Sequence, residues 1–274
     1  GSDLYFQRHD GQAVTITEFV HAMETVSQRD LSQFTAWYTQ AGTPTLTVAE
    51  QYDENTATYT LTVTQAGADT PDSSADEKAL YHLPFTVGLI VDKENIPVVL
   101  ADDKADAAVT PSTSRVLEIT DKTHQFECVN VPNKPVVSLL RHFSAPVRLV
   151  MERTREEYLQ LMCYDEDAFS RWDATQQLAV SIINDLIHAY QHKQTVAIDP
   201  ALLDGLRVIL NDRSLDQAMV ALLLTLPSKA YLTEIATVID VDAIHYAHTQ
   251  LEIFLAEGLQ EMLLARYQEL NVEQ

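Results

Sequence analysis

The sequence predicts a multidomain α and β protein: a short helical segment, then an immunoglobulin-like antiparallel β-sandwich, then an all-α antiparallel helical array. Three observations predict this order. Apolar residues recur at helical spacing in the first 38 residues. The hydrophobic period changes to two at Thr45 and returns to helical spacing after Arg153. We therefore expect domains at residues 1–43, 44–152 and 153–274.

The first segment carries two helix signals. Thr15 and Glu18 form a capping-box pattern, and Asp30 stands where it can cap a second short helix. Gly42 occupies the place of a C-cap glycine, and Pro44 forbids continuation. Two such helices are too small to fold alone. We interpret them as the tail of a domain whose body is missing, and the chain as cut from a longer one.

The sandwich is predicted from period-two runs. Residues 45–50 and 58–64 alternate around turn residues 53–55, which indicates a β-hairpin. The small and acidic residues 66–79 indicate a loop, and turns are expected at 92–95 and 130–135. Six further runs have strand character: 82–91, 98–100, 115–119, 124–129, 136–140 and 147–152.

The helical array is predicted from amphipathic runs joined by short loops. Asp199 followed by Pro200 is typical of an N-cap and first helical residue. Short loops between successive amphipathic helices favour antiparallel packing. The expected helices span 158–162, 171–191, 200–210, 215–226, 229–238 and 242–270.

Charge excludes two classes of partner. The chain has 18 basic and 40 acidic residues, a formal charge of −22. Nucleic acids and anionic membranes attract Lys and Arg, so we expect no nucleic-acid and no membrane partner. The acids do not cluster, so we interpret them as solvated surface rather than a site for cationic ligands. No apolar run approaches the roughly 20 residues that span a bilayer.

The two cysteines, Cys128 and Cys163, fall in different predicted domains. A disulfide is therefore not expected, and a cytoplasmic location fits better. A nucleophilic cysteine needs a nearby base and a cationic setting. We interpret both as packed thiols.

Histidine pairs are the nearest approach to metal ligands. His188 and His192 lie one helical turn apart, and His245, His248 and Glu252 share a face of the last predicted helix. Neither set has a further ligand at a recognised spacing. We expect solvated helix-surface side chains and assign no metal, catalytic or cofactor-binding residue.

Two N-terminal groups are candidates for structural roles. Arg8 and His9 are expected to satisfy buried carboxyls and backbone groups, with Asp10 in a turn. Trp37 and Tyr38 are expected to anchor one domain on the next. An exposed apolar patch around Phe19, Phe34 and Trp37 is also expected, and with it an artificial dimer of the fragment.

The strings "DLYFQRHDGQAVTITEFVHAM" and "DLSQFTAWYTQAGTPTLTV", at residues 3–23 and 30–48, resemble the end of the catalytic domain of bacterial aminopeptidase N, a gluzincin-type zinc peptidase. "FSAPVRL" and "DAFSRWDATQQL", at 143–149 and 167–178, resemble that family's passage from β-sandwich to helical domain. The resemblance covers nearly the whole chain.

The resemblance implies an internal fragment of a zinc aminopeptidase that removes N-terminal residues from peptides. The family's His-Glu-x-x-His motif is absent, because the dipeptide His-Glu does not occur. We therefore expect zinc and peptide substrates in the full-length parent only, and an inactive fragment whose partner is the remainder of its own polypeptide. The alternatives are a free-standing adaptor that binds proteins through the sandwich and array, and an enzyme that binds metal through His188 and His192.

Overall fold

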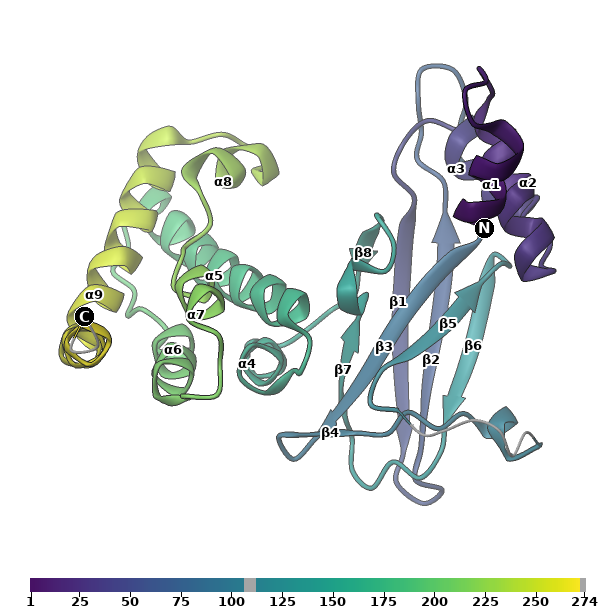
Figure 1. Ribbon diagram of the computed structural model, residues 1–274. Coiled ribbons are helices and arrows are strands. Elements are labelled where there is room, and N and C mark those ends of the chain that lie inside the picture. Colours follow the sequence, from purple (N-terminus) through teal and green to yellow (C-terminus); the bar gives the residue numbers. More distant parts are fainter. Residues whose placement is uncertain (106–111, 272–274) are drawn as a thin grey trace. The chain divides into compact units, whose positions relative to one another are not determined.

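The computed structural model describes residues 1–105 and 112–271. They form two compact units. The first comprises Gly1–Val87, Val98–Lys134 and Phe143–Glu152, and the second Gly88–Pro97, Pro135–His142 and Arg153–Gln274. The predicted order of short helices, sandwich and helical array is confirmed (Figure 1). No helix among the described residues is long and apolar enough to cross a membrane.

The N-terminal segment of the first unit forms α1 (Ser2–His9), α2 (Ile16–Ser27), the 3₁₀ turn η1 (Gln33–Thr35) and α3 (Ala36–Thr39). The predicted capping box is confirmed, because the Thr15 backbone N–H donates to Glu18 Oε2 at 2.9 Å and the Thr15 hydroxyl accepts from the first turn. Helix α1 was not predicted. None of its residues is buried, so its sequence lacks the apolar stripe from which a helix is usually predicted.

Two predicted helix signals in this segment are wrong in position. The Asp30 carboxylate accepts from the Ser32 N–H at 2.8 Å, which makes a local turn rather than a helix cap. Helix α3 ends at Thr39 with Gln40 as its C-cap, so Gly42 is not the capping residue. Gly42 instead has φ +91°, a conformation that glycine adopts readily, in the approach to the first strand.

The first sheet has the strand order β6-β2-β1-β8. The predicted hairpin is β1 (Thr45–Asp53) and β2 (Thr58–Ala66), paired antiparallel from Thr45↔Ala66 to Asp53↔Thr58. Strand β6 (Thr123–Cys128) pairs antiparallel with β2, and β8 (Arg148–Val150) pairs parallel with β1. Alternate side chains of β2, those of Tyr59, Leu61 and Val63, are fully buried, as period-two patterning predicts.

The second sheet has the order β4-β3-β5, with β7 also paired to β3. Its strands are β3 (Leu83–Val91), β4 (Glu94–Ile96), β5 (Arg115–Ile119) and β7 (Val136–Leu139). The turn expected at 92–95 is shorter than predicted: Asp92 and Lys93 both have positive φ and close a tight hairpin into β4. The strand expected at 98–100 is wrong, because only an isolated bridge from Leu100 to Cys128 forms there.

The second unit contains the helical array. Its helices are α4 (Arg155–Tyr164), α5 (Ala168–Gln191), α6 (Ala201–Asn211), α7 (Gln217–Leu223), α8 (Lys229–Ile235) and α9 (Val241–Asn271). Helix α5 packs against α4, α7 and α9 (Figure 1). The apolar core includes Leu178, Ile183, Ile209 and Leu251, each fully or almost fully buried.

Side-chain caps decide where these helices begin. Helix α5 starts three residues before the predicted position, because the Asp167 carboxylate accepts from the Ser170 N–H at 2.9 Å. At α6, Asp199 accepts from the Ala201 N–H at 3.0 Å and Pro200 has helical dihedral angles. The predicted bond from Asp199 is present, but α6 begins at Ala201 with Pro200 as its N-cap, so the predicted start is one residue early.

Candidate functional site

His188 and His192 lie at the end of α5, where their ring centroids are 4.1 Å apart and the rings stack. Both side chains are exposed, as predicted, and His192 Nδ1 lies 2.8 Å from the His188 carbonyl oxygen. Among the described residues, no group of three or more His, Cys, Asp and Glu side chains is placed to hold a metal ion. The pair remains two stacked surface imidazoles.

The second histidine group does not converge on one point. His245 Nδ1 lies 2.9 Å from Lys229 Nζ, whereas His248 Nδ1 lies 3.8 Å from Glu252 Oε2. The prediction of exposed side chains is wrong for His248, whose side chain is only 14% exposed. Burial, with the nearby Lys229 ammonium, lowers the pKa of His248.

Both cysteines are free and buried. Cys128 ends β6, and Cys163 lies near the end of α4, 3.9 Å from the Gly205 carbonyl oxygen. Burial raises the pKa of each thiol to about 11. A thiolate nucleophile is therefore disfavoured at both positions, and the interpretation as packed thiols is confirmed.

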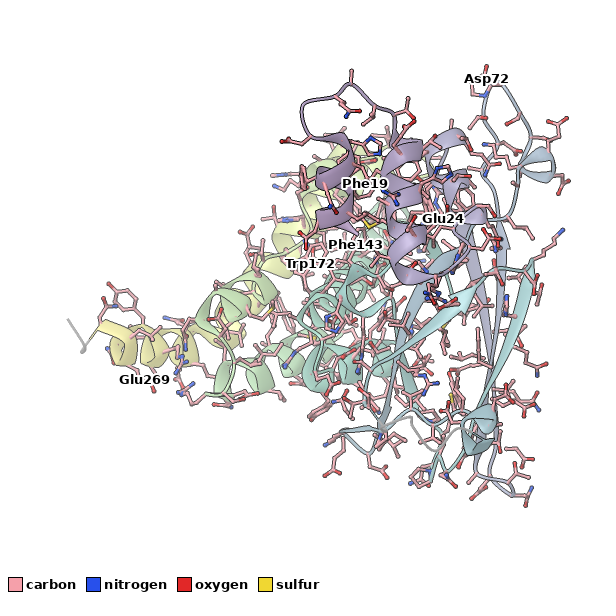
Figure 2. The ribbon with its side chains drawn as sticks, turned by 45° about the vertical axis from the view of Figure 1, so that its right-hand side comes forward. Phe19, Glu24, Asp72, Phe143, Trp172 and Glu269 are labelled. Atoms are coloured by element: carbon pink, nitrogen blue, oxygen red, sulfur yellow. The ribbon has the colours of Figure 1, made fainter. Side chains whose placement is uncertain are left out.

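The prediction for Arg8 and His9 is wrong. Arg8 is exposed, and the described residues include no ion pair to it; His9 is half-buried against Tyr5, with ring centroids 5.6 Å apart. The reason is that α1 lies on the surface and packs on α2, the helix that carries Phe19 (Figure 2). The rings of Tyr5 and Phe19 meet edge to face, with their centroids 5.3 Å apart. Asp10 lies in a turn, as predicted.

Trp37 anchors the N-terminal helices to the sandwich of the first unit, as predicted. Its ring lies 4.7 Å from that of Tyr81, and its Nε1–H donates to the His82 carbonyl at 3.0 Å. Tyr38 does not share this role, because its side chain is 48% exposed.

The exposed apolar residues of this segment also differ from those predicted. Phe19, Phe34 and Trp37 are half-buried, because they pack within the segment and on the sandwich. The large apolar side chains that are exposed instead are Phe6, Ile16, Val26 and Tyr38.

A buried ionic cluster in the second unit was missed by the sequence analysis. The fully buried Arg141 guanidinium lies 2.9 Å from Asp165 Oδ1 and 2.9 Å from Glu166 Oε1. It also donates to Asn95 Oδ1 at 2.6 Å. The run of acids at 165–167 was the available signal, since a carboxylate that becomes buried needs a cation or hydrogen-bond donors nearby.

The cluster joins segments that are distant in the sequence. Asn95 belongs to β4, Arg141 follows β7, and Asp165 and Glu166 connect α4 to α5. Burial raises the pKa of Asp165, and Arg141 offsets part of that effect. Arg141 and Asp165 are fully buried, and their ion pair connects β4, the end of β7 and the turn before α5, so we assign the cluster a structural role.

Three hollows among the described residues of the helical unit are considered as candidate sites. The largest, of about 610 Å³, lies beside Tyr190, Tyr246 and Asp240, and a neighbouring one of about 310 Å³ lies beside Arg155, Asp185 and Asp199. A third, of about 420 Å³, is mostly leucine-lined, with His248 and Glu252 among its lining residues.

Two domain families match the chain. Residues 42–152 match the domain of unknown function DUF3458, described as an Ig-like fold. Residues 155–274 match DUF3458_C, described as ARM repeats. Together these matches agree with a sandwich followed by a helical array.

The relatives are bacterial peptidases. The chain is 38% identical over 267 residues to the aminopeptidase N of Escherichia coli, a match that covers 97% of the chain and 30% of the relative. It is 35% identical to that of Haemophilus influenzae over the same shares, and 36% identical to that of Caulobacter vibrioides over 99% of the chain and 29% of the relative.

A solved structure has the same fold. The aminopeptidase A of Legionella pneumophila, crystallised with aspartic acid, superposes with a TM-score of 0.78 at 25% identity. The match covers 96% of the chain and 28% of that structure. The chain thus spans less than a third of the length of each of these relatives.

Proposed function

We propose that this chain, a homologue of one segment of bacterial aminopeptidase N, is an internal scaffold fragment of a zinc aminopeptidase that removes N-terminal residues from peptides. One observation carries the proposal. The similarity covers 97% of the chain, and so includes the helices, the sandwich and the array, yet it accounts for about 30% of the relatives' length. The part of the parent polypeptide that corresponds to the other 70% or so of the relatives would hold the catalytic residues.

The residues of this chain do not fit a catalytic zinc ion. Such a site needs His, Asp, Glu or Cys ligands that converge on one point, and the described residues contain no group of three. His188 and His192 stack on each other without a third ligand. We therefore assign zinc and the hydrolytic step to the rest of the parent polypeptide.

The scaffold role rests on how the parts are built. In the sandwich, β1 and β2 pair over nine residues each, and aromatic side chains such as Tyr59 and Phe85 are fully buried. Long pairing and a packed core suit a rigid spacer. The array would supply part of a bowl that closes over the active site and admits only small peptides. Free, buried cysteines fit a reducing cytoplasm, which we propose as the location.

Two measurements test the proposal. The purified chain, assayed on alanine p-nitroanilide with added zinc, is expected to show no zinc-dependent turnover and to lose zinc on dialysis against a chelator. The coding DNA upstream of Gly1 is expected to encode His-Glu-x-x-His in the same reading frame. Robust turnover by the chain alone would contradict the scaffold role. A start codon without that motif would favour the adaptor.

A further inference from the structure

The end of α5 carries two histidines on one face of the helix. The His192 N–H donates to the His188 carbonyl oxygen at 3.1 Å, which is the bond that extends an α-helix by one more residue. Residues four apart on a helix are neighbours on its surface. Regular helical backbone therefore holds the two imidazoles side by side.

The two rings lie close enough to share one metal ion. Their centroids are 4.1 Å apart, and their planes are inclined by 27°. A divalent metal ion of the zinc class binds an imidazole nitrogen at about 2.0–2.1 Å, so two nitrogens that share an ion lie about 3 Å apart. Both side chains are exposed, so their torsions are free to bring one nitrogen of each ring to that spacing.

The His192 ring is already oriented as a metal ligand would be. Its Nδ1 lies 2.8 Å from the His188 carbonyl oxygen. A carbonyl oxygen only accepts hydrogen bonds, so in the neutral ring Nδ1 carries the proton and Nε2 keeps its lone pair. A bond from the other ring N–H to a backbone carbonyl is usual for a metal-bound histidine. The His188 ring makes no hydrogen bond to the described residues, so either of its nitrogens can bind.

The electrostatics at this end of α5 permit a cation. The carbonyl end of a helix carries partial negative charge, and α5 ends beside the pair. Among the charged side chains near the pair in sequence, Asp185 is held by Arg155 at 2.7 Å, and Lys193 is exposed. Formal charges therefore add little attraction, and the affinity has to come from the two imidazole nitrogens.

We propose that His188 and His192 form a chelating site for a late divalent transition metal ion, of the class of Ni²⁺, Cu²⁺ and Zn²⁺, with water in the remaining positions. Imidazole suits these ions, whereas Mg²⁺ and Ca²⁺ prefer oxygen ligands. Helical histidines at the same spacing bind the metal in the His-Glu-x-x-His motif, but here Ala189 takes the position of the glutamate that acts as general base. The site binds an ion reversibly and lacks that base.

Calorimetric titration of the untagged chain with Ni²⁺ measures the site. One ion should bind per chain, Cu²⁺ should bind more tightly, and Mg²⁺ should not compete. His188→Ala and His192→Ala should each weaken Ni²⁺ binding roughly tenfold or more, because a second imidazole on the same helix raises the effective ligand concentration. His21→Ala, which removes an exposed histidine of α2, should leave it unchanged.

Two results of the titration would overturn the proposal. One is an affinity for Ni²⁺ that stays the same in both His188→Ala and His192→Ala. The other is a failure of the unmodified chain to saturate at millimolar Ni²⁺. Circular dichroism checks that each variant keeps its helices.

A change of register tests the spacing itself. Asn184 is exposed and lies one turn before His188 on α5. In the His192→Ala background, Asn184→His rebuilds a pair of histidines four residues apart and should restore Ni²⁺ binding, whereas Asn184→Ala should not. Equal affinities of the two double variants would contradict a site made by paired imidazoles.

Paramagnetic broadening locates the ion in the unmodified chain. A small amount of Cu²⁺ should first broaden the amide NMR signals of residues 186–194. Broadening that begins at the N-terminus or around other histidines would overturn the proposal. No step of these tests measures hydrolysis, so their outcome is separate from that of the proposed function.

Discussion

Gly88 and Arg141 are in such close contact that a Cβ atom built on Gly88 would lie 2.0 Å from Arg141 Cζ. The guanidinium cannot move aside freely, since it is fully buried and held by Asp165, Glu166 and Asn95. A glycine is therefore needed at position 88, because any side chain there would collide with Arg141. The absence of a side chain lets β3 lie directly against the ionic cluster.

Gly88→Ala is expected to destabilise the chain by roughly 3 kcal/mol, because the added methyl group displaces a buried charge from its partners. Urea unfolding measures the loss. In an Arg141→Ala background the same substitution should have a much smaller effect, because the clash is gone. Additive effects of the two changes would contradict the proposed contact.

Trp37 and Tyr38 offer a matched pair of neighbouring aromatics. Trp37→Ala should destabilise the first unit by roughly 3–5 kcal/mol, since the ring packs on Tyr81. Trp37→Phe should cost about 1 kcal/mol through loss of the bond to the His82 carbonyl. Tyr38→Ala should change the unfolding free energy little, and a large effect there would contradict the assignment of the anchor to Trp37.

Asp173 on α5 gives a pH-dependent prediction. Burial raises the pKa of its carboxyl, and the partners Gln177 and Arg153 offset this only in part. A raised folded-state pKa means that its favourable contribution is complete below the ordinary aspartate value of 3.8 and is lost as pH rises through the folded-state value. Asp173→Asn should therefore gain stability relative to wild type as pH rises from 3 to 7.

Unfolding of both proteins across that pH range measures the difference. Asp72→Asn, a substitution in the exposed loop after β2 (Figure 2), is the control and should follow wild type. A constant difference between Asp173→Asn and wild type at all pH values would show that the carboxyl does not titrate differently in the folded state.

Cys128 and Cys163 should be unreactive in the folded chain. With a pKa of about 11, roughly one thiol in a thousand is ionised at pH 8, and burial also blocks access. Ellman's reagent should detect no fast-reacting thiol in native protein and two in guanidinium. Rapid native labelling of either cysteine would contradict its packed position.

Local signals in the sequence were enough for much of the fold. The Thr15–Glu18 capping box and the hairpin around residues 53–55 depend on neighbouring residues only, and both are present. The helix start at Asp199-Pro200 was predicted to within one residue. Residues 98–100 have the composition of a strand, but they form only one isolated β-bridge, from Leu100 to Cys128. Whether a short apolar run pairs as a strand depends on partners far along the chain.

The sequence by itself determined the order of helices, sandwich and array, because periodicity records which faces are buried. Only the tertiary structure decided the contacts between distant segments. Asn95, Arg141 and Asp165 meet across 70 residues of chain. No local pattern carries such information, since burial and pairing of a charge or a backbone amide are properties of the whole packed chain.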